Sequence, residues 1–492
     1  MKYCMIKCRK NIKSRSISHN LNQVCYDLSL KRSFIKGDSM RPTSAYIIAS
    51  KEEFKQFVDD FYIVNKKPEC FGICRAELSR MGKSERSDKK VLSVNFPLIN
   101  FKENFGSFAV FASAAKLGEY ENEIIFDVNA AFVFRSLCLF YPFIVEELRS
   151  LPLPQDYGED PVKKFKILCE KFVSDPYSVK SADILFTNSL INSHIGKKHK
   201  NIQVVFELLR HVSDIYYEVD KSYRFQLVGY VEDRKTESLQ VAYAKLQALS
   251  IGAAPLRSLN LDGIFSLLPN LAWSGNTPYE LDYLRENEIS LKMDGNFPVI
   301  DFIDKFPRYL MQVLPQADNI RILDTAKTRF GAFLGAGYTQ MPGASYVNFN
   351  SGALGSCMNE GRISSSVVVG EGTDIGGGAS ILGVLSGGNN DPISIGKNCL
   401  LGANSVTGIS LGDGCIVDAG ISVLAGSIIS ITDDEAKKIL KVNTGFEIES
   451  SGLYKGAKLS GLNGIHYRVS SQDSKLIAFR SRREIALNAD LH

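Results

Sequence analysis

The stretch ISSSVVVGEGTDIGGGASI, residues 363–381, places an aliphatic residue at every sixth position. The same spacing returns at 395–401 and again over 411–429. The aliphatic residues that lead these six-residue units are Ile363, Val369, Ile375, Ile381, Ile395, Leu401, Leu411, Val417, Val423 and Ile429. A short, fixed period of this kind is typical of a solenoid built from stacked repeats.

Two more features repeat with the same period. The residue four positions after each lead residue is compact or β-branched, as at Val367, Thr373, Ala379, Cys399, Ser405, Cys415, Ile421 and Ser427. The residue directly after the lead residue is often glycine, as at Gly370, Gly376, Gly396, Gly402 and Gly412. A glycine-rich flexible segment would not keep aliphatic residues in such a register, so the pattern indicates a fold rather than a linker.

A six-residue unit is long enough for one short strand and one turn, and three units close one triangular coil. We expect the lead side chains to point inward and stack from coil to coil, and the compact residues to fill the narrow interior. We expect the glycines to supply turn dihedrals that a Cβ would resist. The prediction is a left-handed parallel β-helix over 322–430, with loops leaving the coil near 384–392 and 405–410.

The rest of the chain divides around this region. Of the 39 glycines, 22 lie between 331 and 430, so the composition changes sharply at the coil. Upstream, the pattern predicts a helix over 52–65, strands over 90–112 and an amphipathic helix over 239–249. We therefore predict a mixed α/β domain over 44–235, a helical or α+β connecting region over 236–321, and a C-terminal segment over 431–492.

The net charge of +4 comes from one end of the chain. Residues 1–43 hold ten Lys or Arg against two Asp, so the remainder is mildly acidic. An acidic body argues against a nucleic-acid-binding surface. The basic segment has no apolar core of a secretory signal. We expect a non-native start, with the true beginning near Met40; a disordered tail and an organellar transit peptide are the alternatives.

The amino-acid composition limits the class of protein and its cellular compartment. An apolar fraction of 45% with 23% charged residues is that of a globular protein. No run of about 18 apolar residues occurs, so we expect no membrane association through a spanning helix. The ten cysteines are scattered, and the CxxxC at Cys70 and Cys74 lacks a second pair, which favours a reducing, cytoplasmic compartment without bound zinc.

The histidines restrict the chemistry of the coil. None of the six histidines, at positions 19, 194, 199, 211, 466 and 492, lies within 322–430. A histidine-ligated metal site in the coil, and a histidine general base drawn from it, are therefore excluded. Acyl transfer by the coil would have to use a carboxylate. The candidates are Asp324, Glu360, Glu371, Asp374, Asp391, Asp413 and Asp418.

Several longer motifs resemble one family, the tetrahydrodipicolinate N-succinyltransferases, in the branch of longer enzymes from actinobacteria and epsilonproteobacteria. The motifs of the coil are NFNSG (348–352), MNEGRIS (358–364), DIGGGASILGVLSGG (374–388) and GKNCLLGANS (396–405). Those outside it are FGICR (71–75), NFKENFGS (100–107), PLRSLNLDG (255–263), NLAWS (270–274), DKFPR (304–308) and ALNADLH (486–492). The resemblance is specific over 237–492 and weaker over 52–236.

The resemblance implies that the succinyl group of succinyl-CoA passes to the amino group of tetrahydrodipicolinate, in its open form L-2-amino-6-oxopimelate, with release of CoA. This is a step of diaminopimelate and lysine biosynthesis. It implies a homotrimer with active sites between subunits, succinyl-CoA as co-substrate and no tightly bound cofactor. It matches Glu360 to the family's catalytic glutamate, proposed there to form an acyl anhydride, although a general base is equally open.

The resemblance also assigns the contacts with CoA. They are Arg362, Gly377, Ser380, Ala403, Asp418, Ala419, Gly426, Lys455, Arg468, Val469, Ser470 and Ser471. Cationic side chains suit carboxylate and phosphate groups, and small residues leave room for a pantetheine arm.

Two departures from the family pattern stand out. Val469 replaces an arginine, so one phosphate contact is expected to be missing. Ala326 and Ala344 replace the acidic residues that hold an axial magnesium ion in the actinobacterial branch, so we expect no such metal here.

Other interpretations stay open from the residues alone. Glu360 could be a solvated loop carboxylate, Arg362 a surface ion pair, Gly377 a requirement of coil geometry and Asp374 a turn cap. Cys357, Cys399 and Cys415 are read as core fillers rather than nucleophiles. The alternative functions are an N-acetyltransferase on this or another amine, and a non-catalytic β-solenoid.

Overall fold

The computed structural model describes residues 46–81, 89–150, 160–175, 198–211, 222–384, 391–482 and 487. The basic segment 1–43, most of the loop predicted at 384–392 and most of the terminal motif 486–492 lie outside these ranges. The described residues form two compact units, one from 46–78, 89 and the described parts of 102–232, the other from 79–81, 90–101 and the described parts of 233–492. The domain boundaries drawn from the sequence remain predictions.

The first unit is an α/β layer. Strand β4 (Tyr223–Tyr230) pairs antiparallel with β1 (Cys70–Leu78) on one side and with β3 (Glu123–Asp127) on the other. Its helices are α3 (Lys51–Val64), α4 (Phe105–Ala115), α5 (Ala130–Leu139), α6 (Tyr141–Ser150), α7 (Pro161–Ser174) and α9 (Lys200–Arg210). Buried aromatic residues such as Phe108, Phe132 and Phe165 join helices and sheet in one core.

The helix predicted over 52–65 is confirmed as α3, which Ser50 caps by accepting a hydrogen bond from the Glu53 amide. The strand predicted over the second half of 90–112 is wrong, because that segment forms α4. Seven of the eleven residues of α4 are buried. A helix buried on most sides has no polar stripe, so its sequence cannot be told from a buried strand by period.

The second unit begins with β2 (Val91–Phe101) packed on α11 (Leu239–Ser250). The helix over 239–249 is confirmed, but the amphipathic reading is wrong, since every residue of α11 is buried. Its one cation, Lys245, pairs with Asp233 at 2.7 Å. The following elements are α12 (Ile264–Leu267), β5 (Leu271–Ser274), β6 (Thr277–Glu280), α13 (Leu281–Glu286), α14 (Glu288–Met293), β7 (Phe302–Asp304) and α15 (Tyr309–Gln312).

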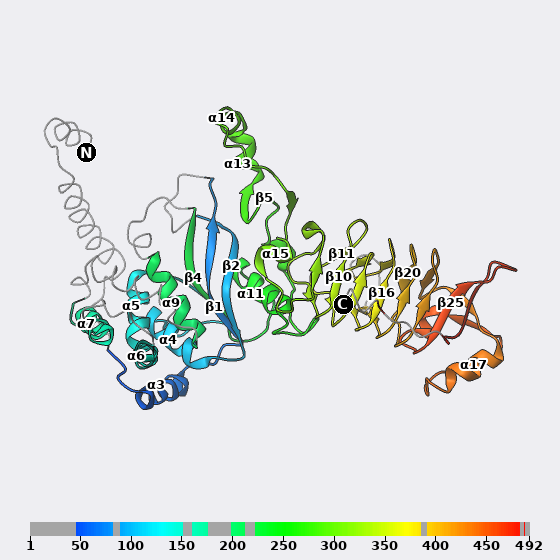
Figure 1. Ribbon diagram of the computed structural model, residues 1–492, viewed down its shortest axis with the longest axis horizontal. Helices are drawn as coiled ribbons and strands as arrows, with labels where there is room; N and C mark the ends of the chain where they lie inside the picture. The colour runs from blue at the N-terminus through cyan, green and yellow to red at the C-terminus, as the bar shows by residue number, and fades with distance from the viewer. Residues whose placement is uncertain are drawn as a thin grey trace. The chain divides into compact units, whose positions relative to one another are not determined.

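The left-handed parallel β-helix is confirmed, and its stacked coils form the rows of short strands in Figure 1. The first face holds β8 (Arg321–Ile322), β10 (Tyr338–Gln340), β13 (Cys357–Asn359), β16 (Thr373–Ile375), β19 (Leu400–Leu401) and β21 (Ile416–Val417). The second holds β11 (Tyr346–Val347), β14 (Arg362–Ile363), β17 (Ser380–Ile381), β20 (Val406–Gly408) and β22 (Ser422–Leu424). The third holds β9 (Phe333–Leu334), β12 (Gly352–Ala353), β15 (Val368–Val369) and β18 (Ser394–Ile395). The chain visits the faces in the order third, first, second in each coil.

The interior agrees with the predicted period. All ten lead aliphatic residues are buried, and so are the compact residues except Ser427, which is half-buried. Equivalent residues of successive coils are paired in register, as Ile363 is with Ile381.

The reason given for the glycines is wrong. The glycines that follow the lead residues do not have positive φ. A Cβ on Gly370 would instead lie 2.6 Å from the carbonyl carbon of Gly396 in the next coil, and one on Gly396 would lie 2.5 Å from the Asp413 nitrogen. Glycine is needed there because the backbones of successive coils approach closely. The positive φ values fall elsewhere in the turns, as at Gly372 and Gly378.

The loop predicted at 405–410 is also wrong. Residues 406–408 are β20, which pairs with β17 and β22 in the middle of the second face. The period is hidden because Thr407 takes the buried position that Ile381 and Val423 take in the neighbouring coils. A hydroxyl-bearing residue at that position breaks the aliphatic pattern without breaking the coil.

The C-terminal segment covers the last coil. It follows β23 (Ile428–Ser430) and contains α17 (Asp433–Leu440), β24 (Leu453–Lys455), a short 3-10 turn at Gly456–Leu459, β25 (Ile465–Val469) and β26 (Leu476–Arg480). A second 3-10 turn, Thr325–Lys327, follows β8 in the coil. Strand β25 pairs parallel with β21 and extends the first face, and β26 pairs antiparallel with β25. In the described part of the chain no helix is both long and apolar enough to cross a membrane.

Candidate functional site

The turns that join the first face to the second form one corner of the β-helix, which we call the first corner. Hydrogen bonds between backbone atoms connect its turns in sequence. The Gly378 amide donates to the Glu360 carbonyl at 3.1 Å, the Asn404 amide to the Gly377 carbonyl at 2.9 Å, and the Gly420 amide to the Ala403 carbonyl at 2.8 Å. These bonds stack the turns directly over one another along the coil axis.

Five of the sequence-predicted site residues lie along this corner. They are Glu360, Gly377, Ala403, Asp418 and Ala419. Residues separated by as much as 59 positions in the chain therefore share one edge of the β-helix, with the glutamate at one end and the aspartate at the other.

Glu360 points its carboxylate over Gly377. Its Oε2 lies 3.3 Å from the place where a Cβ on Gly377 would stand, and nothing else comes within 4 Å of that place. The side chain is half-buried. The absence of a side chain at residue 377 thus leaves open space directly beside the carboxylate, where a reacting group could be placed.

The preceding residue, Asn359, anchors the turn that carries Glu360. The Asn359 side chain is fully buried, its Oδ1 accepts a hydrogen bond from the Gly361 amide at 3.0 Å, and its Nδ2 donates to the Tyr338 hydroxyl at 2.9 Å. The Glu360 amide itself donates to the Ile375 carbonyl at 2.9 Å. The backbone on both sides of Glu360 is therefore fixed.

Two more predicted contacts lie on the outer side of the second face. Arg362 is exposed, and its Nη2 donates to the Ser380 Oγ at 3.1 Å on the next coil. In the described structure this guanidinium has no carboxylate partner among the ion pairs, which argues against the reading of Arg362 as half of a surface ion pair.

Two of the remaining predicted contacts lie away from the first corner. Gly426 lies in the turn after β22, at the opposite edge of the second face, and Lys455 is beside it because the Gly456 amide donates to the Ser427 carbonyl at 2.8 Å. Arg468, Val469, Ser470 and Ser471 lie on β25 and in the turn to β26. Within one chain the predicted contacts thus flank the second face on both sides.

Most other candidate carboxylates have structural partners. Asp324 caps the turn Thr325–Lys327 by accepting from the Ala326 amide at 3.1 Å. Asp413 accepts from the Lys397 amide at 2.7 Å, and Glu371 lies 3.9 Å from the Lys397 ammonium. Asp391 is exposed and Asp374 lies on the first face in register with Leu400. Glu360 is the candidate that stands beside open space at the first corner.

The cysteines of the coil are confirmed as core residues. Cys357, Cys399 and Cys415 are fully buried. Burial raises the pKa of the Cys357 thiol far above its usual range, so a thiolate nucleophile is disfavoured there. Among the described residues no group of three or more His, Cys, Asp or Glu could hold a metal ion.

Two residues near this corner were missed. The exclusion of histidine from the coil is too broad, because β25 brings His466 beside β21, where its Nε2 lies 2.7 Å from Asp418 Oδ1. The period of six ends at Ile429, and no sequence signal connects a histidine 37 positions later with the last coil. Asn359 was missed as well, although it adjoins Glu360 in the quoted motif.

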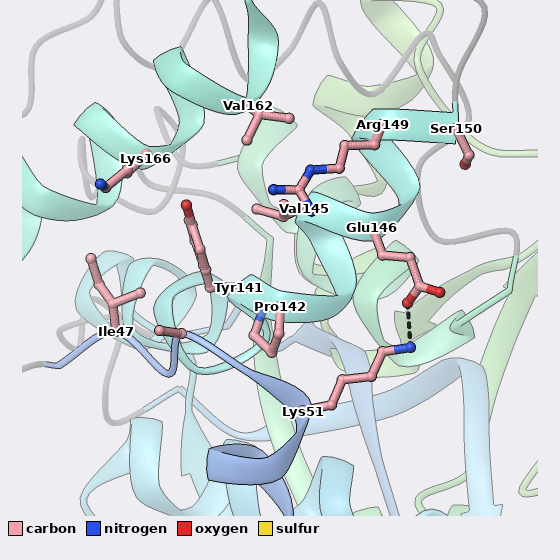
Figure 2. Close-up of a pocket in the computed structure, with 11 residues that line it drawn as sticks. Ile47, Lys51, Tyr141, Pro142, Val145, Glu146, Arg149, Ser150, Val162 and Lys166 are labelled. Atoms are coloured by element: carbon pink, nitrogen blue, oxygen red, sulfur yellow. Dashed lines mark ion pairs between the residues drawn. The ribbon is translucent and has the colours of Figure 1, made fainter.

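A cavity in the first unit is unrelated to this corner. It measures about 860 Å³ and lies among α6, α7 and the start of α3, as Figure 2 shows. Lys51 and Glu146, which both line it, form an ion pair at 2.5 Å, and Lys166 pairs with Glu170 at 3.6 Å. None of the predicted site residues lines it.

Family models match successive parts of the chain. The N-terminal domain of tetrahydrodipicolinate N-succinyltransferase matches residues 52–151 and 173–266, and the middle domain matches 268–308. The hexapeptide repeat of succinyl-transferase matches 392–425.

Whole relatives match over nearly their full length. The 2,3,4,5-tetrahydropyridine-2,6-dicarboxylate N-succinyltransferase of Helicobacter pylori is 53% identical over 449 residues, covering 89% of this chain and 99% of that protein. The protein of the same name from Campylobacter jejuni is 42% identical, covering 91% and 100%. A crystal structure of a Campylobacter jejuni protein, described as a 2,3,4,5-tetrahydropyridine-2-carboxylate N-succinyltransferase, superposes with a TM-score of 0.72 at 40% identity over 89% of this chain and all of that one. The chain therefore belongs to the tetrahydrodipicolinate N-succinyltransferase family.

Proposed function

We propose that this chain transfers the succinyl group of succinyl-CoA to the amino nitrogen of L-2-amino-6-oxopimelate, the open form of tetrahydrodipicolinate, in diaminopimelate and lysine biosynthesis. The single observation that carries the proposal is the Glu360 carboxylate beside the open space over Gly377. The names of the relatives supply the donor group and the acceptor.

Glu360 can serve in two ways. As a nucleophile, its carboxylate attacks the thioester carbonyl, CoA leaves as the thiolate, and the amine then attacks the mixed anhydride and regenerates the carboxylate. As a general base, it takes the proton that the amine loses as nitrogen bonds to the thioester carbon and CoA departs. Both routes give the same products, the N-succinyl amino acid and free CoA.

Succinyl-CoA would lie along the first corner, as a co-substrate rather than a bound cofactor. Gly377 and Ala403 keep this edge shallow, so an extended pantetheine arm can lie against backbone amides. Arg362 and Arg468 are exposed cations at the two ends of the contact set and suit the succinyl carboxylate and the CoA phosphates.

A homotrimer accounts for the divided contact set. Because Gly426 and Lys455 lie across the second face from Gly377, a single ligand would meet both groups if the first corner of one chain faced the other edge in a neighbouring chain. Light scattering after size-exclusion chromatography should then give three times the mass of the chain. The seven cysteines in the described ranges are buried and are not joined in disulfides, which supports a cytoplasmic enzyme.

The assay that tests the proposal is steady-state release of CoA with succinyl-CoA or acetyl-CoA, each with and without the acceptor. We expect release with succinyl-CoA that depends on the acceptor. Equal or faster release with acetyl-CoA would favour the acetyltransferase alternative. No release with either donor would favour a non-catalytic β-solenoid.

The first prediction concerns Glu360. We expect Glu360→Gln to lower kcat by at least about 100-fold, because the amide can act neither as base nor as nucleophile. The control is Glu371→Gln, an exposed carboxylate in the next coil, which should leave kcat unchanged. Thermal unfolding should be the same for both variants, and an active Glu360→Gln enzyme would refute the assignment.

An exchange experiment separates the two routes. Labelled CoA should enter succinyl-CoA in the absence of acceptor if Glu360 forms an anhydride, since that step is reversible. A general base gives no exchange without the amine.

A further inference from the structure

His466 stands at the far end of the first corner from Glu360. Its Nε2 lies 2.7 Å from Asp418 Oδ1, and the other carboxylate oxygen, Oδ2, lies 3.7 Å from Arg468 Nε. The ring of Phe479 on β26 packs against the imidazole with 4.7 Å between ring centroids. The order of contacts is thus Phe479, His466, Asp418 and Arg468.

The exposed fraction of the side chain rises from His466 through Asp418 to Arg468. The His466 side chain is 18% exposed, that of Asp418 38%, and that of Arg468 50%. The imidazole is held in the protein, while the guanidinium reaches solvent. An ionised carboxylate only accepts hydrogen bonds, so the His466 Nε2 facing it must carry the proton.

A backbone hydrogen bond also fixes the position of Asp418 relative to His466 and Arg468. The Asp418 amide donates to the Tyr467 carbonyl at 3.0 Å, between the two residues whose side chains flank the carboxylate. Tyr467 points into the coil and is fully buried, so His466 and Arg468 both point outward on β25. This alternation brings both side chains to the same carboxylate.

We propose that His466 is a positioning residue of the CoA-binding corner, which holds the Asp418 carboxylate and through it directs the Arg468 guanidinium toward the phosphates of CoA. The inference rests on the proposed function, since it needs CoA at this corner. Without the imidazole, the carboxylate is free to turn fully onto Arg468 and neutralise it, or to swing outward and repel a phosphate. Either change weakens the binding of CoA and leaves the chemistry at Glu360 untouched.

The test compares two substitutions of His466. A glutamine can place an amide N–H where Nε2 stands, whereas a leucine fills the space and donates nothing. We expect His466→Leu to raise KM for succinyl-CoA and the dissociation constant of free CoA about tenfold, the usual cost of losing a hydrogen bond to a charged group. The kcat and the KM for the acceptor should stay within twofold, and His466→Gln should resemble the wild type.

The control is Ile465→Val, one position earlier on the same strand with its side chain in the core. It should lower the melting temperature slightly through lost packing and leave KM for succinyl-CoA unchanged. If His466→Leu leaves KM unchanged, or lowers kcat together with both KM values, or if glutamine is as poor as leucine, the positioning role is refuted.

A double-mutant cycle identifies the partner. If His466 acts through Asp418, the pair Asp418→Asn with His466→Leu should bind CoA no more weakly than Asp418→Asn alone. Additive losses would contradict the inference. Calorimetry with free CoA distinguishes the two proposals. If the proposed function is wrong, the wild type does not bind CoA. If only the positioning role is wrong, the wild type binds CoA and the His466 variants bind it equally well.

Discussion

Gly377 shows how one missing side chain can leave open space beside a candidate catalytic residue. Its φ is not positive, so an alanine could adopt the same backbone, and the requirement for glycine is spatial. The two interpretations of Gly377, space for a reacting group and a requirement of coil geometry, can therefore be distinguished. The structure favours a spatial role beside Glu360, unlike at Gly378, where positive φ demands glycine for the turn itself.

Gly377→Ala should fold normally and transfer succinyl groups poorly. The new Cβ would stand 3.3 Å from the Glu360 Oε2, which must move by a few tenths of an ångström. Because such displacements of a reacting group are costly, we expect kcat/KM to fall about tenfold or more. Gly445→Ala, at an exposed glycine with nothing within 4 Å of the new Cβ, is the matched control for steady-state kinetics and melting. Equal activity of both variants would contradict the spatial role.

At the scale of the element, the coil was predictable because its signal is local. Each lead residue is buried by its equivalents in adjacent coils, so burial recurs every six positions and can be read without knowing the rest of the fold. The signal fails where one residue breaks the pattern, as at Thr407, and where burial is complete, as in α4 and α11.

The candidate site was predictable only in part, for a related reason. Glu360 could be found because a motif surrounds it, and its place at the first corner follows from the coil. His466 and Phe479 could not, because they reach this corner through the pairing of β25 with β21, a contact between distant segments with no periodic trace. The close approach of backbones at Gly370 and Gly396 was also invisible until coils were stacked.

Thr407 offers a test of the coil interior. Its side chain is fully buried, and its Oγ1 makes no hydrogen bond within the described structure. Thr407→Val should therefore raise the free energy of unfolding by about 1 kcal/mol, because it removes an unsatisfied buried hydroxyl. Thermal unfolding should show a melting temperature higher by about 2–4 °C.

Thr373→Val is the opposite control. The Thr373 Oγ1 donates to the Gly396 carbonyl at 2.9 Å and accepts from the Cys399 amide at 3.1 Å. Removing it leaves a buried amide unpaired and should lower the free energy of unfolding by about 1–3 kcal/mol. Shifts of the same sign in the two variants would show that the hydroxyl groups do not decide the effect.

At the scale of the whole molecule, the second unit draws on three separate segments of the chain, 79–81, 90–101 and the described residues from 233 onward. Strand β2 belongs with α11 although about 140 residues separate them. Domain prediction from sequence assigns neighbouring residues to the same domain. It therefore could not detect that β2 packs on α11.

The chain should work without a bound metal ion. Ala326 and Ala344 carry no side-chain oxygen, and the Ala326 carbonyl already accepts a hydrogen bond from Arg308 Nε at 2.7 Å. Treatment with EDTA followed by desalting should leave both the specific activity and the mass of the assembly unchanged. Loss of either property, with recovery on adding Mg²⁺, would show that a magnesium site exists despite these alanines.

The strands that follow the last coil have a consequence for the behaviour of the protein in concentrated solution. A stack of coils is a template that could grow without limit, because each bare strand edge offers unpaired N–H and C=O groups to another chain. Here β25 occupies the edge of β21, and β26 turns back antiparallel to it. The hairpin that carries His466 and Arg468 therefore leaves the β21 edge of the first face unavailable to another chain, which disfavours end-to-end growth through that face.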